Sequence, residues 1–330
     1  MHSQDPLLDI QNLSTFFHTE ENIVRSVRNV DLTIYPGETV ALVGESGCGK
    51  SVTALSAMRL VPMPPGNFEN GRILFKGKDL LQASELEMQK IRGNEIGMIF
   101  QEPMTSLNPI FTIGDQIIEA ICLHQDKSHD EARILALKVL KKVAMPSPET
   151  RIDQYPHELS GGMKQRVMIA MSIACKPSLL IADEPTTALD VTIQAQILDL
   201  LDELRKETQM SILLITHNLG IVAQYADRVA VMYSGKIVEL ASVENIFTSP
   251  SHPYTKGLLN SLPKDTISVK LETIPGAVPH PAFLPEGCAF HPRCAEKMGE
   301  CEREIPELQS LDSNPKHQTA CWLYNKTPAL

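Results

Sequence analysis

Residues 44–51 read Gly-Glu-Ser-Gly-Cys-Gly-Lys-Ser and match the pattern G-x-x-x-x-G-K-[ST]. This segment follows an apolar run, residues 40–43, and precedes a helical pattern, residues 52–60. Its glycines allow backbone N–H groups to surround phosphate oxygens, and the following helix N-terminus adds favourable partial charge. Lys50 is expected to reach the β- and γ-phosphates and Ser51 to ligate Mg²⁺. The pattern therefore predicts an α/β fold in which a strand, a loop and a helix bind a nucleotide.

Composition narrows the class of protein further. The chain has 330 residues, a formal net charge of −10 and 43% hydrophobic residues, enough for one large domain or a domain with an appendage. Its longest apolar stretch, residues 167–182, is broken by Lys176-Pro177 and falls short of a membrane helix. The first six residues lack the features of a secretion signal. We expect a soluble intracellular protein that does not bind nucleic acid, since the acidic balance offers no excess of cations to phosphates.

Short apolar runs alternate with helical patterns up to about residue 260, as in a parallel α/β sheet. Two β-rich runs joined at Ser234-Gly235, residues 229–233 and 236–240, predict a hairpin. The runs that predict buried strands are bounded by Gly, Pro or charged residues and comprise residues 40–43, 96–100, 179–182 and 212–215.

The middle and the end of the chain differ from this pattern. Helical periodicity dominates residues 113–123, 130–143 and 161–174, which predicts a helical insert over about 102–176. The last part is rich in proline and has little periodicity, so it could be disordered, but four cysteines there favour a segment fixed by a metal. We therefore predict a nucleotide-binding domain over residues 1–262 and a C-terminal extension over residues 263–330.

Two carboxylates end the apolar run at residues 179–182. Asp183 can hold the Mg²⁺ shell, and Glu184 points to the other side of the pleat, where it can polarise the attacking water. Alone, such a pair is an ordinary strand end. Together with the phosphate-binding loop, it predicts hydrolysis of the bound nucleotide.

Residues 159–166, Leu-Ser-Gly-Gly-Met-Lys-Gln-Arg, stand at the start of a helical pattern shortly before those carboxylates. Ser160 can cap the helix, and Gly161 and Gly162 leave its N–H groups open to an anion. This segment resembles the signature motif of the ATP-binding cassette family of transporter ATPases, and the resemblance covers about residues 7–262. It implies a mostly parallel core sheet, an antiparallel β-subdomain, a helical signature subdomain, and ATP held between two such chains.

The resemblance also implies roles for single residues. Gln101 would contact Mg²⁺ and the attacking water, Asp190 would belong to a loop that communicates across the dimer, and His217 would sense the γ-phosphate. Phe17 would stack on adenine, with adjacent Phe16 as the competing candidate. The implied catalytic residues are Glu184, His217, Lys50 and Gln101, and the implied Mg²⁺ ligands are Ser51, Gln101 and Asp183. The implied ATP-binding residues are Phe17, Gly44, Ser46, Gly47, Cys48, Gly49, Lys50, Ser51, Val52, Gln101, Asp183, Ser160, Gly161, Gly162 and Asp190.

Cys48 occupies a position of the phosphate-binding loop where serine is more familiar in the family. One hypothesis is that alkylation of this thiol blocks the entry of ATP. The alternative is that the side chain points away from the nucleotide.

Four cysteines close the chain with the spacing C-x5-C-x6-C-x19-C, at Cys288, Cys294, Cys301 and Cys321. This spacing matches neither common zinc ribbons nor a ferredoxin, and it leaves open Zn²⁺, an iron–sulfur cluster, and cysteines that are unligated or in a disulfide. His280 and His291 are candidate substitute ligands, but the favoured interpretation of both is a solvated loop histidine. Together with residues 251–259, the cysteines resemble the oligopeptide/dipeptide and nickel branch of the importer ATPases. For dipeptide members that resemblance implies a [4Fe–4S] cluster, which would fix the proline-rich tail.

The resulting prediction is a peripheral ATPase subunit that powers import of di- or oligopeptides at the cytoplasmic face of the membrane. Its partners would be two membrane-spanning permease subunits, a related ATPase subunit or a second copy, and, indirectly, a substrate-binding protein. Residues 101–111 are the expected docking segment. Alternatives are a nickel importer, an exporter, a non-transport cassette ATPase and an iron–sulfur redox protein. A single phosphate-binding loop without heptads before Ser160 disfavours the non-transport class, and Glu184 and His217 disfavour the redox protein.

Overall fold

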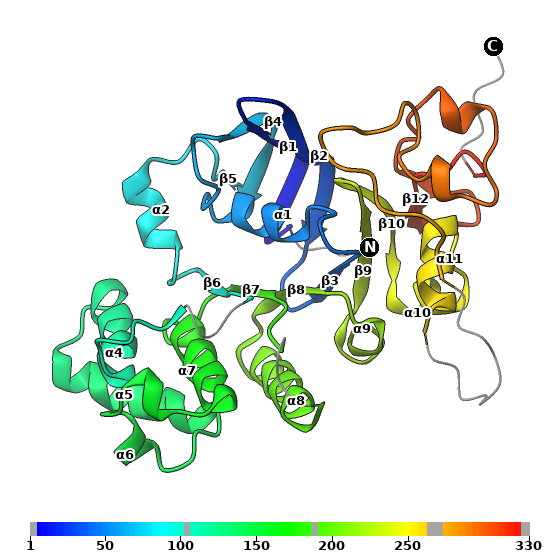
Figure 1. The fold of residues 1–330 in the computed structure, drawn as a ribbon. Coiled ribbons are helices and arrows are strands. Elements are labelled where there is room, and N and C mark those ends of the chain that lie inside the picture. Colours follow the sequence, from blue (N-terminus) through cyan, green and yellow to red (C-terminus); the bar gives the residue numbers. More distant parts are fainter. Residues whose placement is uncertain (1–4, 102–105, 187–190, 263–272, 325–330) are drawn as a thin grey trace. The chain divides into compact units, whose positions relative to one another are not determined.

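The computed structural model describes residues 5–101, 106–186, 191–262 and 273–324. The chain forms two compact units, each built from segments that are separate in the sequence. Figure 1 shows the labelled helices and strands. The first unit contains Ile34–Glu38 and Gln82–Ile215, with the N-terminal residues up to Leu7. The second contains Leu8–Thr33, Thr39–Leu81 and Thr216–Leu330. Within the described ranges, no helix is both long and apolar enough to cross a membrane.

Three parallel strands form the sheet of the first unit: β6 (Ile96–Ile99), β7 (Leu179–Asp183) and β8 (Ser211–Thr216). The strand β7 lies in the middle and pairs with both neighbours. All five of its residues are buried, and the first four are apolar, as expected because parallel strands are covered on both faces. The strands predicted from the three apolar runs are confirmed, although Phe100 lies outside β6.

Helices are frequent in the rest of the first unit, among them α4 (Ile113–His124), α5 (His129–Lys142) and α7 (Gly161–Ile173), which lie within the predicted helical insert. The bounds of that insert stay a prediction. The helices α4 and α5 each begin with a capping box, formed by Thr112 with Asp115 and by Ser128 with Glu131. Both helices pack against α7, and α4 and α5 also pack against each other. The helices of this unit are α2 (Glu85–Ile91), α4 (Ile113–His124), α5 (His129–Lys142), α6 (Pro148–Arg151), η1 (Pro156–Glu158), α7 (Gly161–Ile173) and α8 (Val191–Thr208).

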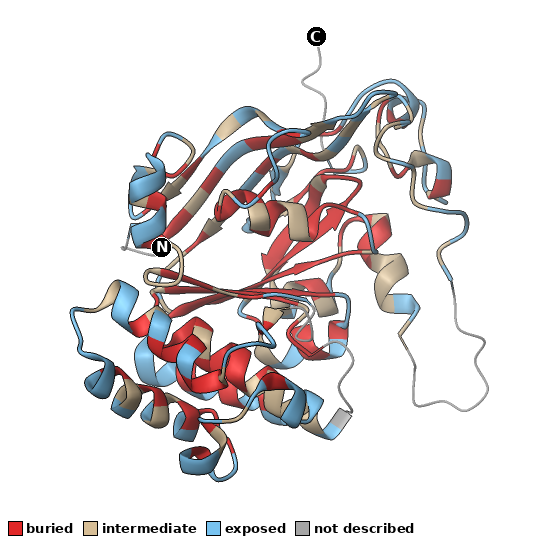
Figure 2. Cartoon of the chain, turned by 60° about the vertical axis from the view of Figure 1, so that its left-hand side comes forward, coloured by how far each residue is buried: buried red, intermediate tan, exposed pale blue. Residues whose placement is uncertain are grey.

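An antiparallel sheet in the order β2-β1-β4-β5 belongs to the second unit and confirms the antiparallel subdomain that the family resemblance implied. Its strands are β1 (Leu8–His18), β2 (Ile23–Ile34), β4 (Gly66–Phe75) and β5 (Lys78–Asp79). Buried and more exposed residues alternate along much of β2 and β4, whereas β7 is buried throughout (Figure 2). The alternation is typical of a sheet that has one face in solvent.

A second sheet of this unit runs in the order β11-β12-β10-β9-β3. The strands β3 (Thr39–Val43) and β9 (Arg228–Tyr233) are parallel, and β9 forms the predicted hairpin with β10 (Lys236–Ser242). Ser234 and Gly235 both have positive φ, as a type I′ turn requires. Beside this sheet the unit contains α1 (Lys50–Ala57), α9 (Leu219–Tyr225), α10 (Val243–Thr248) and α11 (Pro253–Asn260).

The described part of the C-terminal segment, residues 273–324, belongs to the second unit and packs against its hydrophobic core. It contains two short turns, η2 (His291–Arg293) and η3 (Glu300–Glu302), and two strands, β11 (Gln309–Leu311) and β12 (Asn314–Thr319). The strand β12 extends the sheet by pairing with β10, and Phe290 joins the buried core. The domain boundary at residue 262 stays a prediction.

Candidate functional site

The phosphate-binding loop follows β3 and leads into α1, in the second unit. Gly44 has φ 154° and Gly49 has φ 107°, conformations that L side chains rarely adopt. A Cβ atom at Gly44 would lie 2.2 Å from the Met232 carbonyl oxygen, and one at Gly49 would lie 2.3 Å from that of Ser26. Both glycines are therefore required by close approach of backbone as well as by backbone conformation.

Lys50 is buried within this loop. Its ammonium donates to the carbonyl oxygens of Gly44 at 2.9 Å and Glu45 at 3.1 Å. Ser46 and Gly47, at the tip, are exposed. The helix α1 begins after Gly49, which has no side chain to cap it, so the first N–H groups are available to an anion.

Cys48 is 1% exposed, and burial raises the pKa of its thiol. Its sulfur lies 2.8 Å from where a Cβ at Gly44 would be, on the inner side of the loop. Its carbonyl accepts the N–H of Gly235 at 2.8 Å. Burial limits access to the thiol, but its sulfur lies 3.9 Å from Nζ of Lys50, so the effect of its alkylation on the entry of ATP stays a prediction.

Phe16 and Phe17 lie side by side on β1 and point to opposite faces of the strand. Thr15, two residues before Phe17, shares a hydrogen bond of 2.9 Å with Ser56 of α1. Phe17 therefore lies on the face of β1 that contacts the helix following the phosphate-binding loop. Phe16 instead has the guanidinium of Arg25 over its ring, 6.0 Å from the centroid. This geometry favours Phe17 for stacking on a base, a choice that the sequence left open.

Three polar residues of the first unit, Asp183, Glu184 and Gln101, are candidates for binding Mg²⁺ or activating water near the end of β7. Asp183 is buried at the last position of the strand, and Glu184 follows with φ 47°. The N–H of Glu184 donates to the Ile215 carbonyl of β8 at 2.9 Å. The side-chain amide of Gln101 donates to Oε2 of Glu184 at 3.1 Å. Gln101 and Glu184 thus lie together in the first unit.

Ser160 caps α7, because its hydroxyl accepts the N–H of Met163 at 3.4 Å. Gly161 faces open space, so its N–H can be approached by an anion. Gln165, one turn further on, is buried and donates a short hydrogen bond to the carbonyl of Pro185. This contact joins the signature helix to the loop after Glu184, and the sequence analysis did not single it out.

His217 is exposed directly after β8, beside Asn218, which caps α9. Asp190 lies outside the described residues, and so do residues 102–105 of the expected docking segment. Of that segment's described part, Ile110 and Phe111 are exposed, with 73% and 49% of their surface accessible.

The four C-terminal cysteines line one pocket together with His252 and His291. They are free thiols. Burial raises the pKa of Cys288, Cys294 and Cys321, that of Cys321 to about 12. The neighbouring cysteines also contribute to raising the pKa of each of these three thiols. Loading a metal group would therefore release protons from this pocket.

Across residues 5–101, 106–186, 191–262 and 273–324, no three His, Cys, Asp or Glu side chains are grouped so that they could hold a metal ion. A zinc ion needs its ligands within about 2.3 Å of one centre. The arrangement does not match such a mononuclear site. His280, a predicted substitute ligand, packs against Phe283 instead.

The sequence and the structure of this chain are both similar to those of known proteins. The ABC transporter family model matches residues 27–187, and the model "Oligopeptide/dipeptide transporter, C-terminal region" matches residues 238–301. The dipeptide transport ATP-binding protein DppD of Bacillus subtilis is 51% identical over 323 residues, covering 98% of this chain and 96% of that protein. The oligopeptide transport ATP-binding protein OppD of the same organism is 51% identical over 320 residues, covering 96% and 88%.

Among solved structures, a dimeric ATP-binding cassette bound to ADP and Pi is similar, with a TM-score of 0.65 and 27% identity. It covers 72% of this chain and 98% of its own. The ABC transporter model thus matches the cassette, and the oligopeptide/dipeptide transporter model matches the C-terminal region, in agreement with the resemblance found in the sequence. The chain belongs to the ABC transporter family, in the group that carries the oligopeptide/dipeptide transporter C-terminal region.

Proposed function

We propose that this chain is the ATP-hydrolysing subunit of an importer for di- and oligopeptides. The observation that carries the proposal is the match along nearly the whole chain to peptide-transport ATP-binding proteins, at 51% identity. The C-terminal match supports the peptide branch in particular, because it lies outside the cassette itself.

The residues of the second unit would bind ATP. The loop containing Gly44, Ser46, Gly47, Cys48 and Gly49 would surround the phosphates with N–H groups, and Lys50 would leave its loop carbonyls to reach them. Ser51 and Val52 begin the helix that adds partial positive charge. Phe17 would stack on adenine, and His217 would sense the γ-phosphate.

The residues of the first unit would perform hydrolysis. Glu184 would accept a proton from the attacking water, with Gln101 orienting its carboxylate, as their 3.1 Å contact supports. Asp183, Gln101 and Ser51 are the residues that would hold Mg²⁺, which supplies charge neutralisation when bound. Ser160, Gly161, Gly162 and Asp190 would contact the nucleotide of a second ATPase subunit.

Partner subunits follow from this role. We propose two membrane-spanning permease subunits, a second ATPase subunit that is either a related chain or another copy of this one, and a substrate-binding protein that delivers the peptide. The chain would be peripheral, on the cytoplasmic face of the membrane. Exposed Ile110 and Phe111 support a docking surface near the start of α4.

The test is peptide uptake into vesicles that contain the assembled transporter. ATP should drive uptake of a labelled dipeptide, and Glu184→Gln should bind ATP but reduce hydrolysis and uptake at least a hundredfold. Glu203→Gln, on the exposed side of α8, is the matched control. Uptake of Ni²⁺ instead of the dipeptide would overturn the substrate, and full turnover by Glu184→Gln would overturn the role of that residue.

We also propose a [4Fe–4S] cluster on Cys288, Cys294, Cys301 and Cys321. The support is that all four cysteines line one pocket. Against it, no three His, Cys, Asp or Glu side chains among the described residues are grouped so that they could hold a metal ion. The test is the visible absorption of protein purified without oxygen, before and after dithionite. A brown sample that bleaches supports the cluster, and a colourless sample without iron overturns it.

A further inference from the structure

Glu45 places a carboxylate in the phosphate-binding loop, next to Gly44. The side chain keeps 30% of its surface exposed. A negative charge at this position opposes the binding of a triphosphate, unless a cation neutralises it. The structure supplies such a cation from the C-terminal segment.

Arg293 of η2 forms a bidentate ion pair with Glu45. Its two terminal nitrogens donate to the carboxylate oxygens at 2.6 and 3.1 Å, and the arginine side chain is only 5% exposed. Planar bidentate pairs of this kind are the stronger ones, since they fix geometry as well as charge. Arg293 is therefore held where it can fix the position of Glu45.

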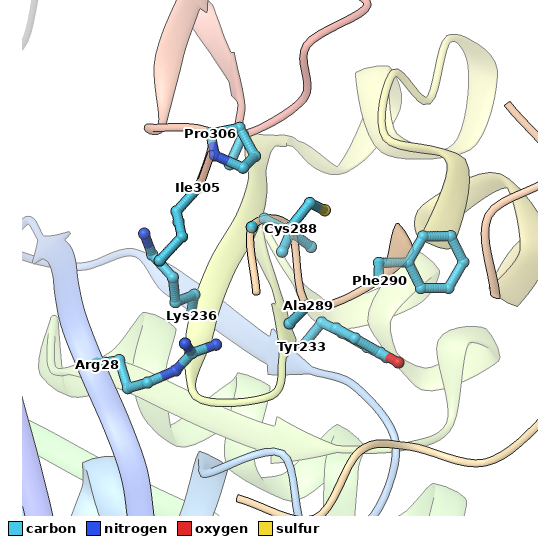
Figure 3. A pocket seen from close by; sticks show the side chains of 11 residues that line it. Arg28, Tyr233, Lys236, Cys288, Ala289, Phe290, Ile305 and Pro306 are labelled. Carbon is cyan, nitrogen blue, oxygen red and sulfur yellow. The ribbon is translucent and has the colours of Figure 1, made fainter. Parts of the chain in front are cut away.

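Further contacts hold the guanidinium in place. Its Nε donates to the Pro275 carbonyl at 2.9 Å, and one terminal nitrogen donates to the Tyr233 hydroxyl at 3.3 Å. The guanidinium carbon lies 5.8 Å from the centroid of the Tyr233 ring. Figure 3 shows the pocket in which Tyr233 lies beside Cys288, Ala289 and Phe290 of the C-terminal segment.

The backbone of Glu45 is held from the same region. Its N–H donates to the Tyr254 hydroxyl at 2.9 Å. The rings of Tyr254, Tyr233 and Phe290 form one buried cluster with centroids 4.7 to 5.4 Å apart. Both the side chain and the N–H of this loop residue are thus fixed by residues that lie near the cysteine pocket.

We propose that Arg293 is a positioning residue of the ATP site, which neutralises Glu45 and holds the phosphate-binding loop in the conformation that accepts ATP. The proposal rests on the proposed role of residues 44–51 in binding the phosphates. It makes the segment between Cys288 and Cys294 a part of the nucleotide site.

The test measures ATP binding to the full chain by calorimetry in Arg293→Ala, Arg293→Lys, Glu45→Gln and the double variant Arg293→Ala/Glu45→Gln. Arg293→Ala should raise the Kd for ATP about tenfold, more at low salt, because the carboxylate is no longer neutralised. Arg293→Lys should restore part of the affinity. The double variant should bind ATP more tightly than Arg293→Ala, since the repelling charge is gone.

Two results would overturn the proposal. One is wild-type affinity in a folded Arg293→Ala protein; the other is a double variant as weak as Arg293→Ala, which would show that Arg293 acts without Glu45. If Arg293→Ala does not fold, Arg293→Gln, which removes the charge but keeps much of the side chain, is compared with wild type, and an unchanged Kd and salt dependence overturns the proposal. Lys297→Ala, which breaks an exposed ion pair with Glu302, is the matched control. Lys50→Ala tests whether residues 44–51 bind the phosphates of ATP at all. An unchanged Kd in Lys50→Ala would contradict that premise, independently of the result for Arg293.

Discussion

Glu239 is a fully buried carboxylate that connects three parts of the second unit. One of its oxygens accepts the N–H of Ser251 at 2.6 Å and Nε2 of His317 at 2.6 Å, and the other accepts the N–H of His252 at 3.0 Å. The residue thereby fixes β10 to the start of α11 and to β12. We predict that its substitution releases the C-terminal segment before the rest of the unit unfolds.

The size of the effect follows from these contacts. Glu239→Ala leaves the imidazole and two N–H groups without their buried acceptor, which costs about 3–5 kcal/mol of unfolding free energy. For a unit of this size the unfolding midpoint should fall by roughly 6 to 20 °C. Glu239→Gln keeps the shape and one acceptor oxygen, so its cost should be about 1–3 kcal/mol.

The pH dependence has a definite sign. Burial opposes ionisation of Glu239, but the hydrogen bonds from His317, Ser251 and His252 outweigh it and hold the pKa below its usual value. A carboxyl whose pKa is lower in the folded state contributes stability above the unfolded pKa, near 4.5. That contribution is lost as the pH falls through the folded pKa. Glu239→Gln should therefore lose less stability than the wild type on acidification below about pH 4.5.

The assay is urea unfolding followed by tryptophan fluorescence, at pH 7 and pH 4. The chain has one tryptophan, Trp322, whose indole donates to the Glu304 carbonyl at 3.1 Å, so the signal reports on the C-terminal segment. Glu244→Gln, an exposed position at the start of α10, is the control and should stay within about 0.5 kcal/mol. A Glu239→Ala protein with the wild-type midpoint and pH profile would refute the reasoning.

Further predictions concern the nucleotide-binding residues. Iodoacetamide at pH 7.5 should modify exposed Cys122 and leave buried Cys48 intact in the native protein; mass spectrometry of peptides shows which thiol reacts, and rapid modification of Cys48 contradicts its burial. Gly44→Ala should weaken ATP binding and lower the unfolding midpoint, because the new Cβ meets a backbone carbonyl at 2.2 Å; unchanged binding and stability contradict this. Phe17→Ala should cost about 1–3 kcal/mol of ATP binding measured by calorimetry, whereas Phe16→Ala should cost little, and the reverse order would assign the base to Phe16.

Sequence patterns predicted those structural features that are determined by residues close together in the chain. The phosphate-binding loop needs glycine where φ is positive, and its eight residues carry that requirement themselves. The buried strand β7 follows from an unbroken apolar run, and the cap of α7 follows from Ser160 and the glycines after it. Such features could be read because each is determined by residues close together in the chain.

Other features depend on partners far apart in the chain. Arg293 and Glu45 are separated by 248 positions, and His317 and Glu239 by 78. The strand β12 has the polar sequence Asn-Pro-Lys-His-Gln-Thr, without the apolar alternation that predicts a strand. The choice between Phe16 and Phe17 required the pairing of β1 with the helix α1, which no local pattern specifies.

The ion pair of Arg293 with Glu45 makes the phosphate-binding loop of the cassette depend on the C-terminal region. A carboxylate beside bound phosphates is unfavourable by itself, and a loop that carries one depends on the cation that neutralises it. Here that cation comes from a segment with little regular structure, which packs into the core through Phe290 and whose cysteines line a neighbouring pocket. Whatever stabilises the pocket therefore also stabilises the position of Arg293. It follows that a change at the cysteines should be felt first in the affinity for ATP, before any change in the residues that hydrolyse it.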